Sequence, residues 1–140
     1  VYHCVRFIAR NNFITRAPEA GIVTVYTKDC KVLNNTIHDP QSRRGRLVRT
    51  VFTNDGLLIA NNLMSGVKMS HESESEVTFL NNLIKDFTHA FADPGRGDLH
   101  LTSAGVEAID QGVLQAEVAE DIDAQRRGDK PDIGADELTY

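Results

Sequence analysis

Four side chains that can carry a positive charge or move a proton lie in three glycine-led stretches of the chain, residues 21–26, 45–50 and 66–71. These side chains are Tyr26, Arg49, Lys68 and His71. A guanidinium or ammonium group can neutralise a carboxylate, and an imidazole or phenol can take up or deliver a proton. If the three stretches are neighbouring strands of one sheet, the four side chains occupy comparable positions and form a candidate catalytic set.

A basic segment lies between these stretches. Residues 38–49 contain four Arg and one His against one Asp, although the whole chain has a formal net charge of −5. This contrast predicts a local basic groove for an anionic ligand. The candidate binding residues are Lys28, His38, Arg43, Arg44 and Arg46. The alternative is that the arginines are solvated and pair with Glu72, Glu74 and Glu76 one coil away.

Length and composition set the broad class of the protein. A chain of 140 residues with 41% hydrophobic content fits one domain with its own core. The acidic balance provides no general attraction to nucleic acid or to an anionic membrane. The longest apolar stretches fall well short of the ~20 residues that a membrane-spanning helix needs. We therefore expect neither nucleic acid nor a membrane as a partner.

An Asn-Asn pair recurs four times and organises the elements that would position these side chains. The copies read FIARNNFI, CKVLNNTI, LLIANNLM and VTFLNNLI. Their pairs are Asn11 and Asn12, Asn34 and Asn35, Asn61 and Asn62, and Asn81 and Asn82. Successive pairs are 23, 27 and 20 residues apart, a period typical of solenoid proteins.

Aligning the four copies produces three wholly apolar columns. Two precede the pair, namely Phe7, Cys30, Leu57 and Val77, then Ala9, Val32, Ile59 and Phe79. The third follows it and contains Ile14, Ile37, Met64 and Ile84. Two strands joined at an Asn corner, plus one glycine-led strand, predict coils that stack into three parallel sheets. Asn tolerates the corner backbone, and its amides can bond between coils ~4.8 Å apart as a ladder. The repeat leaves open which Asn of each pair faces inward.

This pattern resembles the right-handed parallel β-helix of the pectate-lyase-like superfamily over about residues 5–91. A second match lies in the tail, where DLHLT (98–102), AIDQG (108–112), DID (121–123) and PDIGADE (131–137) are similar to the ending of many secreted bacterial β-helix proteins. The tail departs from that ending at Gln125 and is longer over 113–120. The predicted fold is all-β, with three sheets, about four coils and an Asn ladder.

The two ends of the predicted solenoid differ. We expect residues 1–92 to form the coils and residues 93–140 to form an irregular C-terminal cap, because the last coil would otherwise expose its core and strand edges. Within that segment we expect a short strand at Leu99 and Leu101, a brief helix over 104–109 and helical turns over 113–124. The first coil has no predicted cover, which points to further coils upstream or to self-association through this coil.

The resemblance implies a secreted or cell-surface protein that binds or degrades acidic polysaccharide. For a lyase acting by β-elimination, it implies that Arg49 or Lys68 neutralises the substrate carboxylate and that His71 or Tyr26 transfers protons. The alternative is a non-catalytic structural or glycan-binding module. No metal ligand set or cofactor is predicted, except that the tail carboxylates would suit calcium. These carboxylates are Asp121, Asp123, Asp132, Asp136 and Glu137.

Overall fold

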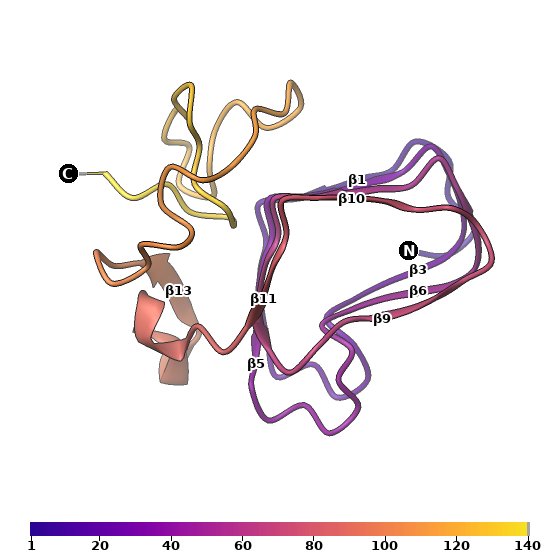
Figure 1. Ribbon diagram of the computed structural model, residues 1–140, viewed down its shortest axis with the longest axis horizontal. Coiled ribbons are helices and arrows are strands. Elements are labelled where there is room, and N and C mark those ends of the chain that lie inside the picture. Colours follow the sequence, from indigo (N-terminus) through magenta and orange to yellow (C-terminus); the bar gives the residue numbers. More distant parts are fainter. Residues whose placement is uncertain (140) are drawn as a thin grey trace.

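The computed structural model of the chain describes residues 1–139 and has the predicted all-β class, a parallel β-solenoid of about three coils (Figure 1). The first sheet contains β1 (Ile8–Arg10), β4 (Lys31–Leu33), β7 (Leu58–Ala60) and β10 (Thr78–Leu80). The second contains β2 (Phe13–Thr15), β5 (Thr36–Asp39), β8 (Leu63–Gly66) and β11 (Leu83–Lys85). The third contains β3 (Ile22–Lys28), β6 (Val48–Asp55) and β9 (Ser70–Ser73). The solenoid has about three coils, not the predicted four. The four Asn corners mark the start and the end of three full turns.

The three apolar columns face the inside of the coils, as predicted. Their middle members, such as Val32, Ile37 and Ile59, are completely buried. The same columns are exposed at the two ends of the solenoid, at Phe7 and at Phe79. The inside of the coils is therefore a continuous apolar core that stays uncovered at both ends within residues 1–139. No helix in this range is long and apolar enough to cross a membrane.

The structure decides which Asn of each pair faces inward. The second Asn forms the inner ladder, in which Asn35 Nδ2 donates to Asn62 Oδ1 at 2.9 Å. The same bond joins Asn12 to Asn35 at 2.8 Å and Asn62 to Asn82 at 2.9 Å. The first Asn of each pair has a left-handed backbone, with φ between 49° and 57°. This conformation, which Asn tolerates well, turns the corner and points the first side chain outward.

The third sheet contains the glycine-led stretches, but two of the three glycines act differently from the prediction. Only Gly45 has a positive φ, of 60°. A Cβ on Gly21 would lie 2.5 Å from the Leu47 carbonyl oxygen, and one on Gly66 would lie 2.7 Å from that of Asp39. Gly66 also ends β8 instead of opening the third strand. These two glycines are needed because the backbones of adjacent coils approach closely there.

The C-terminal tail lies beside the coils, not over the last one, which corrects the predicted position of the cap. Figure 1 shows the tail next to the corner between the first and second sheets. Its apolar side chains pack on the outer face of the second sheet in a cluster of Leu63, Phe87, Ala90, Phe91, Leu99, Leu101, Ala108 and Ile133, with Phe13 and Leu83 at its margin. The outer face of this sheet offers Phe13, Leu63 and Leu83, and burying these side chains favours docking of the tail there. The last coil stays open.

The outward Asn side chains hold the tail in place by hydrogen bonds to its backbone. Asn81 Nδ2 donates to the Gln111 carbonyl at 2.7 Å, and Asn61 Nδ2 donates to the Val113 carbonyl at 2.6 Å. Asn34 and Asn11 make the corresponding bonds to Asp132 at 3.3 Å and to Glu120 at 2.7 Å. The inner Asn column thus joins coil to coil, whereas the outer column joins the coils to the tail and adds one bond between coils, from Asn61 Nδ2 to Asn34 Oδ1 at 3.3 Å.

The tail contains little regular structure. The 3₁₀ turns η1 (Thr88–Ala90) and η2 (Pro94–Arg96) flank β12 (Phe91–Asp93), which pairs antiparallel with β13 (Asp98–Leu101), so the predicted strand at Leu99 and Leu101 is confirmed. The predicted helix over 104–109 and the predicted helical turns over 113–124 are wrong, because the first segment forms turns and the second is mostly irregular with two short turns. Backbone groups in the tail bond to specific distant partners, as when Asp110 N donates to Asp132 Oδ1 at 2.7 Å.

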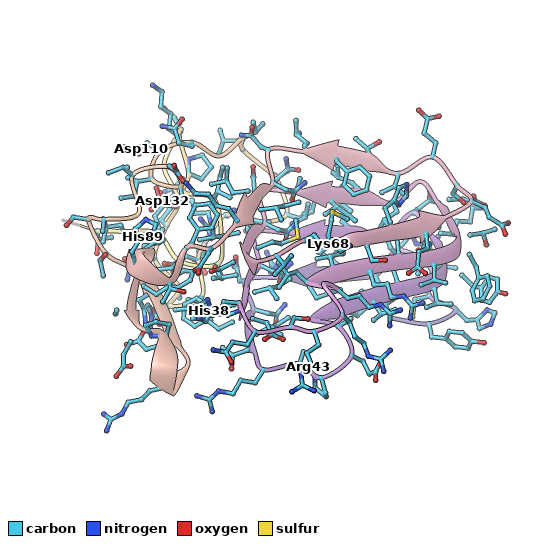
Figure 2. All side chains as sticks on the ribbon, turned by 60° about the horizontal axis from the view of Figure 1, so that its bottom comes forward. His38, Arg43, Lys68, His89, Asp110 and Asp132 are labelled. Atoms are coloured by element: carbon cyan, nitrogen blue, oxygen red, sulfur yellow. The ribbon has the colours of Figure 1, made fainter. Side chains whose placement is uncertain are left out.

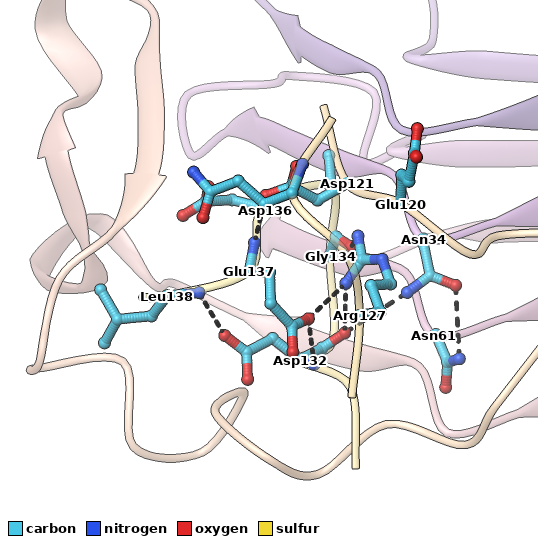
Figure 3. Close-up of polar contacts among 12 residues, drawn as sticks. Asn34, Asn61, Glu120, Asp121, Arg127, Asp132, Gly134, Asp136, Glu137 and Leu138 are labelled. Atoms are coloured by element: carbon cyan, nitrogen blue, oxygen red, sulfur yellow. Dashed lines mark hydrogen bonds and ion pairs between the residues drawn. The ribbon is translucent and has the colours of Figure 1, made fainter. Parts of the chain in front are cut away.

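A buried ionic network holds the end of the tail together (Figure 3). Arg127 is almost fully buried, and it donates to Glu137 Oε2 at 2.9 Å and to the Gly134 carbonyl at 2.9 Å. The two Asp132 oxygens accept the N–H groups of Asp110 and Leu138. Burial raises the pKa of Asp132 and of Glu137 above their ordinary values. The residues of the tail that resemble DIGADE-type endings therefore belong to a structural network.

Candidate functional site

The structure does not bring the four candidate catalytic residues together. Arg49 lies on the outer face of β6, where its Nε donates to Glu72 Oε2 in β9 at 2.6 Å. The hydrogen bonds from Arg49 and from Ser70 lower the pKa of Glu72 to about 2. Arg49 is therefore already paired with an ionised carboxylate. Val48, the residue before it, is fully buried, so the strand directs Val48 inward and Arg49 outward.

His71 lies on the opposite face of the same sheet. It is in register with Thr50, which is completely buried, and its Nδ1 is 2.6 Å from Thr50 Oγ1. The His71 ring also meets Phe79 of an inward column, with centroids 5.1 Å apart. Residues in register share a face of the sheet, so His71 points into the open end of the last coil. The sheet itself separates His71 from Arg49.

Tyr26 and Lys68 lie at opposite ends of the third sheet. Tyr26 has a φ of 52° near the end of β3, where its ring stacks on Phe52 with centroids 5.0 Å apart. Lys68 precedes β9, and its side chain lies so close to Gly45 that a Cβ there would be 2.9 Å from it. Tyr26 belongs to a stack of corner aromatic rings, and Lys68 packs beneath the loop that leads into β6.

Three of the predicted binding residues converge on a cleft between the coils and the tail. The main cleft has a volume of about 700 Å³ and is lined by Thr15, Arg16, His38, Asp39, Pro40, Gln41, Asp86, Thr88, Pro94 and Gly95. A smaller hollow of about 370 Å³ adjoins it and is lined by Arg16, Ala17, Pro18, Asp39, Gln41, Ser42, Arg43 and Arg44. Figure 2 shows His38 between coils and tail and Arg43 on the loop beyond β5. We call the two hollows together the lateral cleft.

The other two predicted binding residues lie outside the lateral cleft. Lys28 ends β3, at the opposite end of the third sheet from the loop that contains Arg43. Arg46 is directed to Glu19, with its NH1 3.7 Å from Glu19 Oε2, and Arg44 Nε is 3.4 Å from the same oxygen. The alternative pairing of these arginines with Glu72, Glu74 and Glu76 does not form. Arg43 makes no ion pair within residues 1–139 and is available at the mouth of the cleft.

The floor of the cleft holds a neutral histidine. Burial lowers the pKa of His38, and the nearby carboxylates of Asp86 and Asp39 oppose this shift only in part. Its Nδ1 is 2.9 Å from Ser65 Oγ, which also accepts the Phe87 N–H at 2.9 Å. Ser65 Oγ makes no further hydrogen bond within residues 1–139, so the tautomer in which its hydroxyl donates to Nδ1 is the one that satisfies the buried Ser65 hydroxyl. The remaining ring proton of His38 is then on Nε2, as a donor.

Asp86 and Asp39 supply acceptors beside this donor. Asp86 Oδ1 accepts the Thr88 hydroxyl at 2.5 Å and the Thr88 N–H at 2.9 Å, and these bonds lower the pKa of Asp86. Asp86 is therefore ionised at neutral pH. Across the cleft, the Arg16 guanidinium donates to the Gly95 carbonyl, which joins the sheet wall to the tail wall. The lateral cleft combines hydrogen-bonding groups on its floor with arginines at its mouth.

Sequence reasoning missed Arg16 and Asp86, although the repeat contains a signal for both. Thr15, His38, Ser65 and Lys85 are in register across the second sheet. The residues that follow them, Arg16, Asp39, Gly66 and Asp86, therefore form one column at the edge of the cleft. Extending the aligned columns by two positions would have found it. The tail wall formed by Pro94 and Gly95 had no such signal, because it lies outside the repeat.

The tail also brings a histidine and carboxylates together. His100, Asp123 and Asp136 offer ligand atoms that all lie within 4.8 Å of one another. Both His100 ring nitrogens already face carboxylates, Asp98 at 2.5 Å and Asp123 at 2.7 Å. Burial lowers the pKa of His100, but these two hydrogen bonds outweigh it and leave the pKa raised. The group is thus closed by its own ion pairs. It also mixes nitrogen with oxygen, whereas calcium prefers oxygen ligands alone, and calcium binding stays a prediction.

Comparisons of the chain with family models, with curated proteins and with solved structures found no match. The pectate-lyase-like superfamily therefore stays a resemblance of pattern and fold.

Proposed function

We propose that the chain binds an acidic polysaccharide in the lateral cleft. The observation that carries the proposal is the order of groups along the cleft, with a neutral His38 and the carboxylates of Asp39 and Asp86 on its floor and Arg43 at its mouth. A polysaccharide of uronate units offers hydroxyl groups and a carboxylate at a regular spacing. The volume of about 700 Å³ is within the usual range of roughly 300–1,000 Å³ for ligand sites.

Each group has a role that follows from its protonation state. The Arg43 guanidinium, with Arg44 beside it, pairs with a uronate carboxylate through charge-assisted hydrogen bonds. Sugar hydroxyls donate to Asp39 and Asp86, and His38 Nε2 donates to a sugar oxygen. Since acidic polysaccharides are chiefly outside cells, the proposal includes a secreted or cell-surface location.

We propose binding in preference to cleavage. Lyase chemistry needs a cation at the substrate carboxylate and proton-transfer groups close to it. The side chain of Arg49 is already paired with Glu72, and His71 points to the inner face of the sheet. The residues in the lateral cleft provide recognition, whereas the four candidate catalytic residues are scattered around the third sheet.

Calorimetric titration with oligogalacturonate tests the binding proposal. The double variant Arg43→Ala/Arg44→Ala should bind at least roughly tenfold more weakly, because each lost charge-assisted hydrogen bond costs about 1.5–3 kcal/mol. Lys28→Ala is the matched control, since it removes one exposed cation outside the cleft and should leave the affinity unchanged. Equal affinity of wild type and double variant would refute the proposal, and so would equal binding of an uncharged oligosaccharide of the same length.

Cleavage is tested separately. The purified chain should give no rise in the ultraviolet absorbance of unsaturated products when it is incubated with polygalacturonate, alginate or chondroitin. A steady rise would restore the lyase hypothesis, and loss of that rise in Arg49→Ala or His71→Ala would assign the chemistry to the third sheet.

A further inference from the structure

A stack of aromatic rings lies at the corner where the third sheet turns into the first. The rings belong to His3, Tyr26 and Phe52 on successive coils, and we call them the corner stack. The ring centroids of His3 and Tyr26 are 4.9 Å apart, and those of Tyr26 and Phe52 are 5.0 Å apart with the two planes 3° from parallel. These distances match the ~4.8 Å between coils, so the stack adds one ring per coil. The corner lies on the opposite side of the coils from the tail (Figure 1).

The corner stack is on the surface and not in the core. All three of its residues have a left-handed backbone, with φ between 51° and 58°, a conformation that bulky residues rarely adopt. Tyr26 is 38% and Phe52 is 46% exposed. Single exposed apolar side chains are ordinary, whereas a contiguous exposed group indicates an interaction surface.

The stack ends at Phe52 and leaves one face of its ring without an aromatic partner. The next residue in register is Ser73, which has no ring. The Ser73 hydroxyl donates to the Phe52 carbonyl at 2.9 Å, so this side chain is directed at the backbone of the corner. Within residues 1–139, the aromatic ring stacked on Phe52 is that of Tyr26, on the opposite face. A planar group placed one coil spacing beyond Phe52 would continue the stack.

The surroundings of this ring face are acidic. Glu74 lies at the corner, where its N–H donates to the Phe52 carbonyl at 2.7 Å. Glu74 and Glu76 are exposed, and neither makes an ion pair within residues 1–139. Arg49, on the neighbouring strand, is already neutralised by Glu72. The face of an aromatic ring is also electronegative, so the ring and the free carboxylates favour the same kind of ligand, a cation.

We propose that the open face of Phe52 binds the guanidinium group of an arginine in a basic segment of a partner polypeptide. A guanidinium is planar and cationic and stacks on aromatic faces. Its face lies on the Phe52 ring while its edge donates to the Glu74 carboxylate. A lysine ammonium has the charge but not the planar shape, and it is more strongly hydrated. Arginine binding at this corner and glycan binding in the lateral cleft are independent properties.

Calorimetric titration with two peptides tests the proposal. One peptide alternates glycine with arginine and the other alternates glycine with lysine, at equal length and charge. The wild type should bind the arginine peptide at least roughly twofold more tightly, because only the planar cation stacks on the ring. Equal affinity for the two peptides, or no binding of either, would overturn the proposal.

Variants of Phe52 assign this preference to the ring. Phe52→Leu keeps an apolar side chain but removes the ring face, so the affinity for the arginine peptide should fall roughly two- to fivefold and the preference over lysine should disappear. Phe52→Tyr keeps the face and should retain both. Val67→Ala is the matched control, since it shortens another exposed apolar side chain and should leave the affinity unchanged. A preference for arginine that persists in Phe52→Leu would place the peptide elsewhere and refute the assignment.

A carboxylate pair of variants tests the acidic part of the corner. Glu74→Gln should weaken binding of the arginine peptide roughly two- to fivefold, as expected for loss of an exposed ion pair. Glu120→Gln makes the same charge change at an exposed position in the tail and should have little effect. Far-ultraviolet circular dichroism checks that the variants are folded. Equal weakening by both variants would mean that the peptide responds to net charge alone, and would contradict a site at Phe52.

Discussion

The coils and the tail of this protein are stabilised in opposite ways. In the coils, each group bonds to its own equivalent one coil away, as in the inner ladder of Asn35 and Asn62. In the tail, buried groups bond to partners of another kind, as Arg127 bonds to Glu137 and to the Gly134 carbonyl. A repeated interaction can lose one step and keep the rest, whereas a unique buried network depends on every member. Four predictions test this difference.

The largest effect is expected from Arg127→Met. Removing the guanidinium leaves the Glu137 carboxylate without its cationic partner and the Gly134 carbonyl without that donor. Breaking a buried ion pair in this way costs about 3–5 kcal/mol, and urea unfolding should show that loss in the free energy of unfolding. Arg126→Met, at the exposed neighbour, is the control and should change stability by no more than about 0.5 kcal/mol. A loss in Arg127→Met as small as the control's would mean that the tail network does not hold the tail.

A smaller effect is expected within the Asn pairs, and its size should depend on the column. Asn62→Gly removes bonds to Asn35 and to buried carbonyls inside the coil, so we expect a loss of about 2–3 kcal/mol. Asn61→Gly keeps the left-handed corner, at φ 54°, and loses chiefly the bonds to the tail, so we expect about 1 kcal/mol. Thermal unfolding of both variants measures the contrast. Equal losses would show that the two columns are not distinct.

The pH dependence of stability should have opposite signs in the two regions. Burial lowers the pKa of His38 in the coils, so the unfolded chain takes up its proton first and stability falls as pH drops below about 6.5. The pKa of His100 in the tail is raised overall, so its stabilisation is present below about 6.5 and is lost as pH rises through the folded-state value. Each slope is at most about 1.4 kcal/mol per pH unit.

Single variants assign these slopes. In denaturant unfolding between pH 5 and about 8, a range that spans the ordinary histidine pKa, His38→Gln should remove the destabilisation at acidic pH. His100→Gln should instead remove stabilisation there. If both variants shift the profile of stability against pH in the same direction, the conclusion that the two histidines have opposite effects on stability is wrong.

The smallest effect is expected from the exposed contact between last coil and tail. Lys85 Nζ lies 2.6 Å from Glu107 Oε1, and both side chains are about half exposed. Exposed ion pairs typically contribute about 0.2–1 kcal/mol. A double-mutant cycle with Lys85→Met and Glu107→Gln should therefore give a coupling in this range, which declines with added salt. A larger coupling would mean that surface charge, and not the buried network, joins the two regions.

Much of the coil architecture was predictable because a solenoid repeats its own constraints. The columns through Val32, Ile37 and Ile59 are apolar in all four copies, and each copy confirms the register of the others. The same alignment could have located Arg16 and Asp86, since they follow the second strand of their coils. The placement of Tyr26 and His71 was harder to predict. A bulge between Val25 and Thr27 shifts the register beside Tyr26, and His71 belongs to the inward-facing column of Thr50.

The sequence by itself determined the corners and the inward columns of the coils, because a repeated local pattern specifies backbone geometry and burial. The tertiary structure alone decided which Asn faces inward, since both members of each pair have the same chemistry and only the left-handed backbone of the first one distinguishes them. It alone also placed the tail. The tail docks where the apolar side chains on the outer face of the second sheet lie next to the outward Asn side chains, and this meeting of distant residues creates the lateral cleft.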